Sequence, residues 1–176
     1  GRAAKDASRT VPLVMAASGE PVGGGVVASL ARPGANVTGL SGSVFELSAK
    51  RIELLREMVP QLSRVAGLFD MSDPVNPPEW KEAEMAARSW GLETQLLDVR
   101  KPEDLRRAFE SAITQRADAI VVGSAALTRT NLGAIASLAA KHRLPAIFQS
   151  REFVDAGGLI SYGVSFPDLY RRAATF

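Results

Sequence analysis

Short, continuous runs of apolar residues alternate along this chain with longer stretches in which apolar residues recur every three or four positions. A continuous run is typical of a strand buried on both faces, and the longer spacing is typical of an amphipathic helix. Strands separated by helices predict an α/β fold with a parallel sheet. From residue 64 onward the pattern predicts five strands, at residues 64–69, 94–99, 118–122, 145–148 and 159–162.

The first sixty residues predict only two strands, at residues 12–16 and 37–40. Between these strands, apolar residues after Pro21 keep a helical spacing, and residues 32–36 stop it. These residues are Val22, Val26, Val27 and Leu30. Two parallel strands with crossing helices cannot bury both faces of a sheet, so we expect the chain to be a fragment of a larger fold.

A long amphipathic helix is expected from Glu46 onward. Its apolar face carries Leu47, Ile52, Leu54, Leu55 and Met58. Its charged residues are expected to point largely outward, and they are Lys50, Arg51, Glu53, Arg56 and Glu57. The later helices are expected at residues 77–90, 102–115, 131–142, 151–156 and 167–176.

Composition narrows the class of protein. The chain of 176 residues is 46% hydrophobic and 23% charged, which excludes intrinsic disorder. It has no cysteine and one histidine, so disulfides, Cys₄ zinc sites and imidazole metal clusters are excluded, and we expect no metal or cofactor. Its 21 basic and 19 acidic residues are interspersed and not clustered, which argues against a nucleic-acid partner.

One glycine motif suggests an enzyme that binds a nucleotide. Residues 23–28, Gly-Gly-Gly-Val-Val-Ala, match the G-x-G-x-x-G/A pattern of dinucleotide-binding proteins. The context is unfavourable, because six residues separate the first glycine from the strand and no acidic residue ends the next strand. A nucleotide-dependent α/β enzyme that uses residues 23–28 therefore stays open as an alternative.

Small polar residues follow the predicted strands. In open α/β sheets, ligands bind beyond the carboxyl ends of the strands, so these residues are the candidate ligand contacts. Several of them could instead cap helices. Because the set contains no nucleophile paired with a base, it predicts binding of a small polar molecule without chemical change. The candidates are Ser18, Glu20, Asp70, Ser72, Asn76, Ser124, Gln149 and Tyr162.

Several long segments give the chain a family resemblance. Residues 20–23, 28–40 and 50–55 resemble the ABC-transporter substrate-binding protein family that includes tryptophan- and tyrosine-binding lipoproteins. Residues 139–147 and 151–163 continue the similarity, which covers nearly the whole chain. Glu20 departs from the pattern, since the family usually has aspartate there, and the longer side chain would change the ligand's position or identity.

The resemblance implies a class I periplasmic-binding-protein fold with two Rossmann-like parallel-sheet lobes. On this sequence, residues 1–60 would be the second half of the N-terminal lobe and residues 61–163 a near-complete C-terminal lobe. Residues 164–176 would cross back to the first lobe. The crossings are expected at residues 41–45 or near Pro60, and at residues 163–167.

The resemblance also implies a function. Such a protein captures a solute between its lobes outside the cytoplasm, closes by hinge motion and delivers the solute to an ABC permease. A module of the same fold that senses the ligand for a regulator is a second alternative. Strands missing from the first lobe would leave exposed sheet edges, through which copies of the chain could pair as a homodimer.

Overall fold

A computed structural model of the protein describes residues 2–19, 21–42 and 44–176. Its contacts divide the chain into unit 1, made of residues 1–44 and 164–176, and unit 2, made of residues 45–163. The chain first passes from unit 1 to unit 2 between residues 44 and 45. This boundary lies within residues 41–45 and not near Pro60, so the long helix that follows belongs to unit 2.

Unit 2 is built on a parallel five-stranded sheet in the order β4-β3-β5-β6-β7. Each strand lies within two residues of the range expected from its apolar run. The strands are β3 Arg64–Phe69, β4 Glu93–Asp98, β5 Ala119–Val122, β6 Ala146–Phe148 and β7 Ile160–Ser161. The α/β fold with parallel sheets that the sequence predicts is confirmed.

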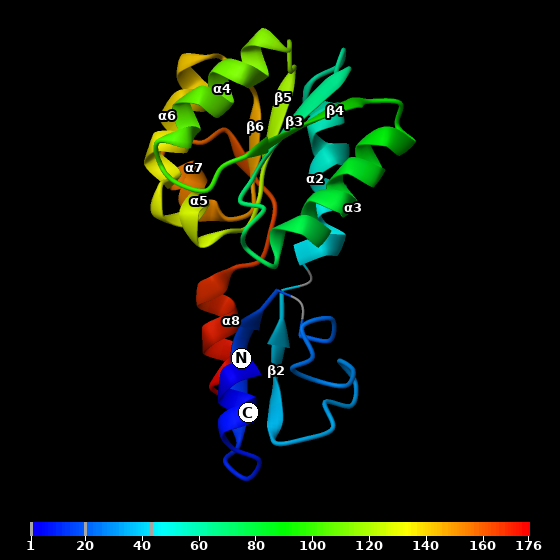
Figure 1. The fold of residues 1–176 in the computed structure, drawn as a ribbon, viewed down its shortest axis with the longest axis vertical. Coiled ribbons are helices and arrows are strands. Elements are labelled where there is room, and N and C mark those ends of the chain that lie inside the picture. The colour runs from blue at the N-terminus through cyan, green and yellow to red at the C-terminus, as the bar shows by residue number, and fades with distance from the viewer. Residues whose placement is uncertain (1, 20, 43) are drawn as a thin grey trace. The chain divides into compact units, whose positions relative to one another are not determined.

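Helices cover both faces of this sheet (Figure 1). The helices of unit 2 are α2 Val44–Met58, α3 Asn76–Ser89, α4 Asp104–Thr114, α5 Ala126–Thr130, α6 Leu132–Lys141 and α7 Arg151–Asp155. Helices α4 and α6 close one face through a core that includes Phe109 and Ile135. Helices α2 and α3 close the other face through a core that includes Leu55 and Trp80. A parallel sheet requires such two-sided cover, because both of its faces are apolar.

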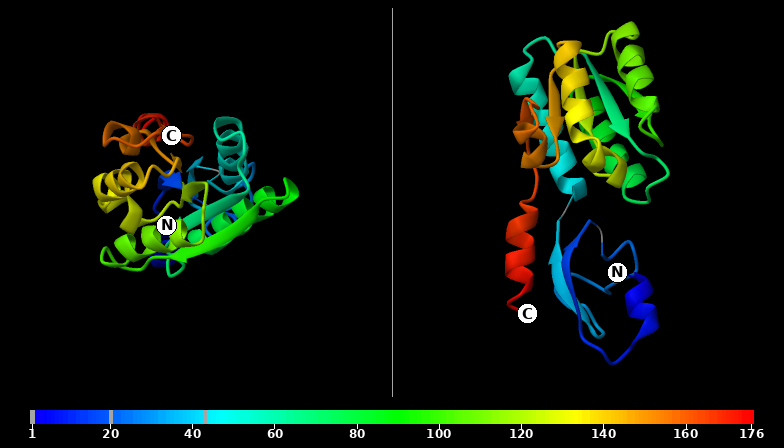
Figure 2. Two further views of the ribbon diagram at one scale, coloured as in Figure 1. Left: turned by 90° about the horizontal axis from the view of Figure 1, so that it is seen from above. Right: turned by 90° about the vertical axis from the view of Figure 1, so that its left-hand side faces the viewer.

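The described residues of unit 1 form a two-stranded parallel pair and two helices. Helix α8 packs against β1 and β2, as the right-hand view of Figure 2 shows. The elements are α1 Arg2–Ala7, β1 Leu13–Ser18, β2 Val37–Ser41 and α8 Phe166–Ala173. Val26, Val27 and Val37 form its small apolar cluster.

Two sequence expectations about local structure are wrong. Residues 21–31 form turns, bends and irregular backbone in place of the expected helix, because three consecutive glycines at residues 23–25 make a helix unfavourable there. The apolar spacing at Val26 and Val27 instead serves to bury both side chains. Arg51, expected to point outward, is buried on α2.

Candidate functional site

The strand order of unit 2 changes direction between β3 and β5. From β3 the chain moves to β4 on one side and then returns to β5 on the other side. The loops after these two strands therefore diverge, and such a switch point is where α/β proteins bind ligands. Six of the eight residues expected from the sequence follow strands of this sheet at this end: Asp70, Ser72 and Asn76 after β3, Ser124 after β5, Gln149 after β6 and Tyr162 after β7.

The other two expected residues belong to the first part of the chain. Ser18 is the last residue of β1 and is half-buried. Its backbone carbonyl accepts a hydrogen bond from the Gly42 N–H at 2.7 Å. Glu20 lies outside the described residues.

Asn76 joins the two loops at the switch point. Its Oδ1 accepts a hydrogen bond from the Asp70 N–H at 3.0 Å, and its Nδ2 donates to the Ser124 carbonyl at 3.1 Å. The Asn76 side chain is fully buried. The sequence allowed Asn76 to cap α3, but it is the first residue of that helix and its amide ties β3 to β5. Its role in this arrangement is to position the loops.

Asp70 and Ser72 form a tight turn at the rim of the same loop. The Ser72 N–H donates to Asp70 Oδ1 at 3.0 Å, and the Ser72 hydroxyl donates to the same oxygen. Asp70 is half-buried and Ser72 is exposed. This turn places a carboxylate and a hydroxyl beside each other at the end of β3.

A buried ion pair lies beneath these loops. Arg51 Nη1 and Glu79 Oε1 are 2.8 Å apart, and their side chains are 1% and 0% exposed. Glu79 also accepts hydrogen bonds from the Ser124 N–H at 2.8 Å and from the Ser124 hydroxyl at 3.0 Å. Glu79 therefore fixes the loop after β5, as Asn76 of the same helix does through the Ser124 carbonyl.

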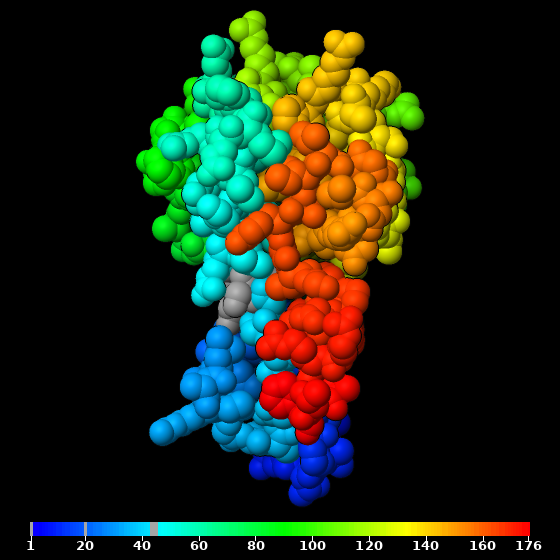
Figure 3. All heavy atoms as spheres, turned by 180° about the vertical axis from the view of Figure 1, so that it is seen from behind, coloured from blue at the N-terminus to red at the C-terminus, as the bar shows by residue number. Residues whose placement is uncertain are grey.

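Arg51 extends this network to the end of unit 2. Its Nε donates to the Tyr162 carbonyl at 2.8 Å. Accordingly, α2 and the segment leading to Gly163 are neighbours on the face of unit 2 that Figure 3 shows. Burial lowers the pKa of the Arg51 guanidinium, and the facing Glu79 carboxylate opposes that shift. No local pattern predicts the pairing of Arg51 with Glu79, because their side chains meet only when α2 packs against α3.

Gln149 differs from the other residues of the site. It is 3% exposed, and neither its Nε2 nor its Oε1 has a hydrogen-bond partner among the described residues. Its backbone is closely packed, since a Cβ atom at Gly163 would lie 1.8 Å from the Gln149 carbonyl oxygen. Tyr162 lies on the adjoining strand segment, where its N–H donates to the Phe148 carbonyl at 2.9 Å. The Tyr162 side chain is 39% exposed.

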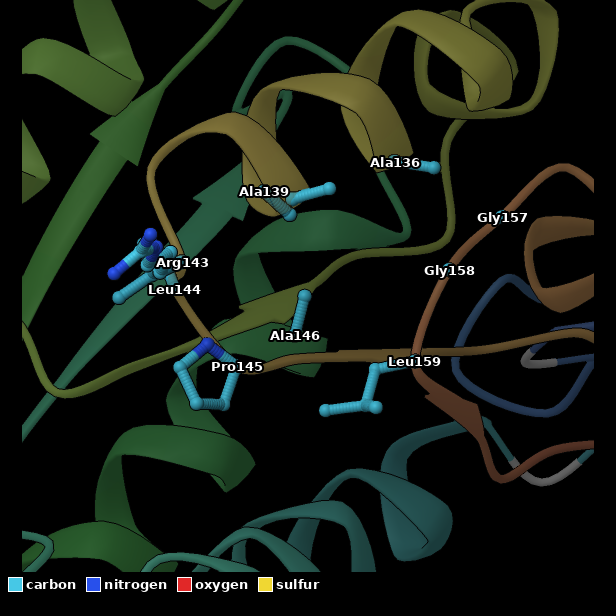
Figure 4. Close-up of a pocket in the computed structure, with 10 residues that line it drawn as sticks. Ala136, Ala139, Arg143, Leu144, Pro145, Ala146, Gly157, Gly158 and Leu159 are labelled. Carbon is cyan, nitrogen blue, oxygen red and sulfur yellow. The ribbon is translucent and has the colours of Figure 1, made fainter.

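The pocket in Figure 4 lies at a different part of unit 2. It has a volume of about 420 Å³, and its lining includes Ala139 of α6, Ala146 at the start of β6, and Leu159. Because these residues lie near the amino end of β6, this pocket is separate from the polar strand ends. Its one charged lining residue is Arg143. We therefore do not assign it to a polar ligand.

The described residues provide no metal centre. No three or more of their His, Asp or Glu side chains are grouped so that they could hold a metal ion. Within the same residues, none of the helices combines the length and the apolar character needed to cross a bilayer.

Comparisons with known proteins give the site a family context. The model of a family described as ABC transporter substrate binding protein matches residues 1–176. A curated tyrosine-binding protein from Clostridioides difficile strain R20291 is 23% identical over 172 residues, which cover 98% of this chain. The match covers 49% of that relative, so the chain spans about half its length.

Two solved structures show the fold. An ABC domain from Streptococcus pneumoniae in complex with L-Trp has a TM-score of 0.82 at 23% identity, covering 97% of this chain and 58% of that one. A periplasmic sugar-binding protein of an ABC sugar transporter from Legionella pneumophila has a TM-score of 0.64 at 12% identity, covering 98% of this chain and 64% of that one. The fold is therefore α/β of the periplasmic-binding-protein type.

Proposed function

Since this chain belongs to the ABC transporter substrate-binding protein family, we propose that it acts as the solute-binding component of an ABC importer. It would capture an amino acid or a similar small polar metabolite outside the cytoplasm and deliver it to a membrane permease. The observation that carries this proposal is the family match along the whole chain, and the polar strand ends of unit 2 support it.

The chemistry of unit 2 suits an amino acid. The half-buried Asp70 carboxylate offers a counter-charge for an ammonium group. The Ser72 and Ser124 hydroxyls already donate to Asp70 and Glu79, so their oxygens are left to accept a hydrogen bond from a donor group of the ligand, such as its ammonium. Ser18 and Glu20 are proposed as the contacts that unit 1 contributes. The relatives named above are a tyrosine-binding protein and a complex with L-Trp, which favours amino acids as the first ligands to test.

The nucleotide-dependent enzyme is less well supported. The dinucleotide fingerprint requires its glycines to open a helix, whose N-terminus holds the pyrophosphate. Residues 23–28 lie in a segment of turns and bends, so the described structure provides no such helix there. The family is moreover one of substrate-binding proteins.

Calorimetric titration with the twenty standard amino acids tests the proposal. We expect saturable binding of at least one amino acid. Asp70→Asn should weaken that binding about tenfold to a hundredfold, because a hydrogen bond to a charged group contributes about 1.5–3 kcal/mol. Asp155→Asn, at an exposed position of α7, is the control and should leave the affinity unchanged. A flat response across the whole panel would remove the amino-acid part of the proposal.

A further inference from the structure

The side-chain amide of Gln149 is buried at a high energetic cost. The residue is only 3% exposed, and the donor and the acceptor of its amide both lack a partner among the described residues. Leaving a buried polar group unpaired carries the full penalty of removing it from water. Such groups are rare in native structures and call for a specific explanation, such as a ligand that pairs with them.

The other buried amides of unit 2 are at least partly paired. Asn76 uses both its oxygen and its nitrogen in hydrogen bonds to the protein. Gln95 donates from Nε2 to Ser111 Oγ at 3.0 Å, and only its Oε1 lacks a partner. Among the buried side-chain amides that the structure describes, both atoms are unpaired only at Gln149.

The position of Gln149 points to a ligand. It directly follows β6, at the same end of the sheet as Asp70 and Ser124. Its backbone has little freedom to move away, because Gly163 packs against the Gln149 carbonyl and the Tyr162 N–H bonds to Phe148. The fixed backbone therefore holds an unsatisfied amide at the candidate site.

We infer that Gln149 is a specificity-determining residue that binds a neutral ligand group carrying both a hydrogen-bond donor and an acceptor. A phenolic hydroxyl or a carboxamide has this chemistry. A purely apolar group would leave both amide atoms of Gln149 unpaired, and an indole N–H would satisfy only the oxygen. Because the amide is uncharged, it does not neutralise an ammonium or a carboxylate, and those charged ends of the ligand fall to other residues. This inference rests on the proposed function.

The first experiment needs no ligand. Thermal unfolding of the protein is compared with that of Gln149→Met and of Gln95→Met. Methionine has a similar volume and needs no hydrogen-bond partner, so Gln149→Met should leave the unfolding midpoint unchanged or raise it by about 3 °C. Gln95→Met removes the hydrogen bond to Ser111 and should lower the midpoint. The inference is overturned if Gln149→Met lowers the midpoint as much as Gln95→Met does.

The second experiment uses pairs of ligands that differ in one polar group, L-tyrosine with L-phenylalanine and L-glutamine with L-methionine. In a pair that binds, we expect the member with the donor–acceptor group to bind at least tenfold more tightly, because a site built for a polar group rejects an analogue lacking it. In Gln149→Met that ratio should approach one. A ratio near one in the wild type, or an unchanged ratio in the variant, would overturn the inference. If the wild type binds no amino acid, the amino-acid part of the proposed function and the specificity role inferred for Gln149 both fail, and the unfolding comparison still shows whether the Gln149 amide is unpaired in the folded protein.

Discussion

Replacement of Arg51 by methionine would leave the Glu79 carboxylate buried without its counter-charge. The two groups are 2.8 Å apart, and both side chains are almost completely excluded from water. Removing one partner of such a pair costs about 3–5 kcal/mol, because the remaining charge is neither solvated nor paired. The two Ser124 hydrogen bonds to Glu79 would remain, but a neutral hydroxyl and an N–H do not replace the guanidinium.

Tryptophan fluorescence during urea unfolding reports on unit 2, which contains the Arg51–Glu79 ion pair, and so measures this loss of stability. The two tryptophans of the chain, Trp80 and Trp90, both lie in unit 2, and Trp80 packs against Phe69 in its core. With an m value of about 2 kcal/mol per molar urea, a loss of 3–5 kcal/mol lowers the midpoint by about 1.5–2.5 M. Arg151→Met breaks an exposed ion pair with Asp155 and should cost no more than about 1 kcal/mol.

A double variant tests the physical cause. Arg51→Met with Glu79→Gln removes both charges and keeps an amide oxygen that can accept the Ser124 N–H. We expect the double variant to be more stable than Arg51→Met alone, with a coupling energy of about 1–3 kcal/mol. If the two changes are instead additive, the uncompensated charge does not explain the loss, and the reasoning is refuted.

Two further predictions concern backbone packing and pH. Gly163→Ala places a Cβ atom 1.8 Å from the Gln149 carbonyl oxygen and should lower the free energy of unfolding by more than about 1 kcal/mol. The control is Gly133→Ala in α6, where a Cβ atom meets open space, and it should not lower this free energy. Equal effects of the two substitutions in urea unfolding would contradict the packing at Gly163. Partial burial raises the pKa of Asp118, but hydrogen bonds, first the one from the Ser63 N–H, outweigh this effect and hold the pKa below its usual value. The ionised Asp118 therefore stabilises the fold above about pH 4, and this contribution is lost as the pH falls through the folded pKa. When the free energy of unfolding is measured against pH, the wild type should be more stable than Asp118→Asn at neutral pH, and the difference should shrink in acid.

Much of unit 2 follows from local patterns. The strand at residues 64–69 is predicted with its observed bounds, because a continuous apolar run must be covered on both faces. The same pattern places the polar candidates, since residues that follow parallel strands lie at one end of the sheet. The helix expected after Pro21 is wrong, because the glycines at residues 23–25 outweigh the helical recurrence of the valines.

The partners of the buried polar groups could not be predicted from local patterns. Arg51 and Glu79 are 28 positions apart and come from separate helices, so periodicity alone placed Arg51 on an exposed face. The unpaired amide of Gln149 was equally hidden, because a sequence shows that a residue is polar and does not show what surrounds it.

The sequence by itself therefore determined the α/β class and the residues that end each strand, because strand and helix periodicities are properties of neighbouring residues. Only the tertiary structure decided that Arg51 is buried against Glu79 and that Gln149 is buried without a partner. Hydrogen bonding and desolvation depend on atoms that distant segments bring together, and no local pattern encodes them.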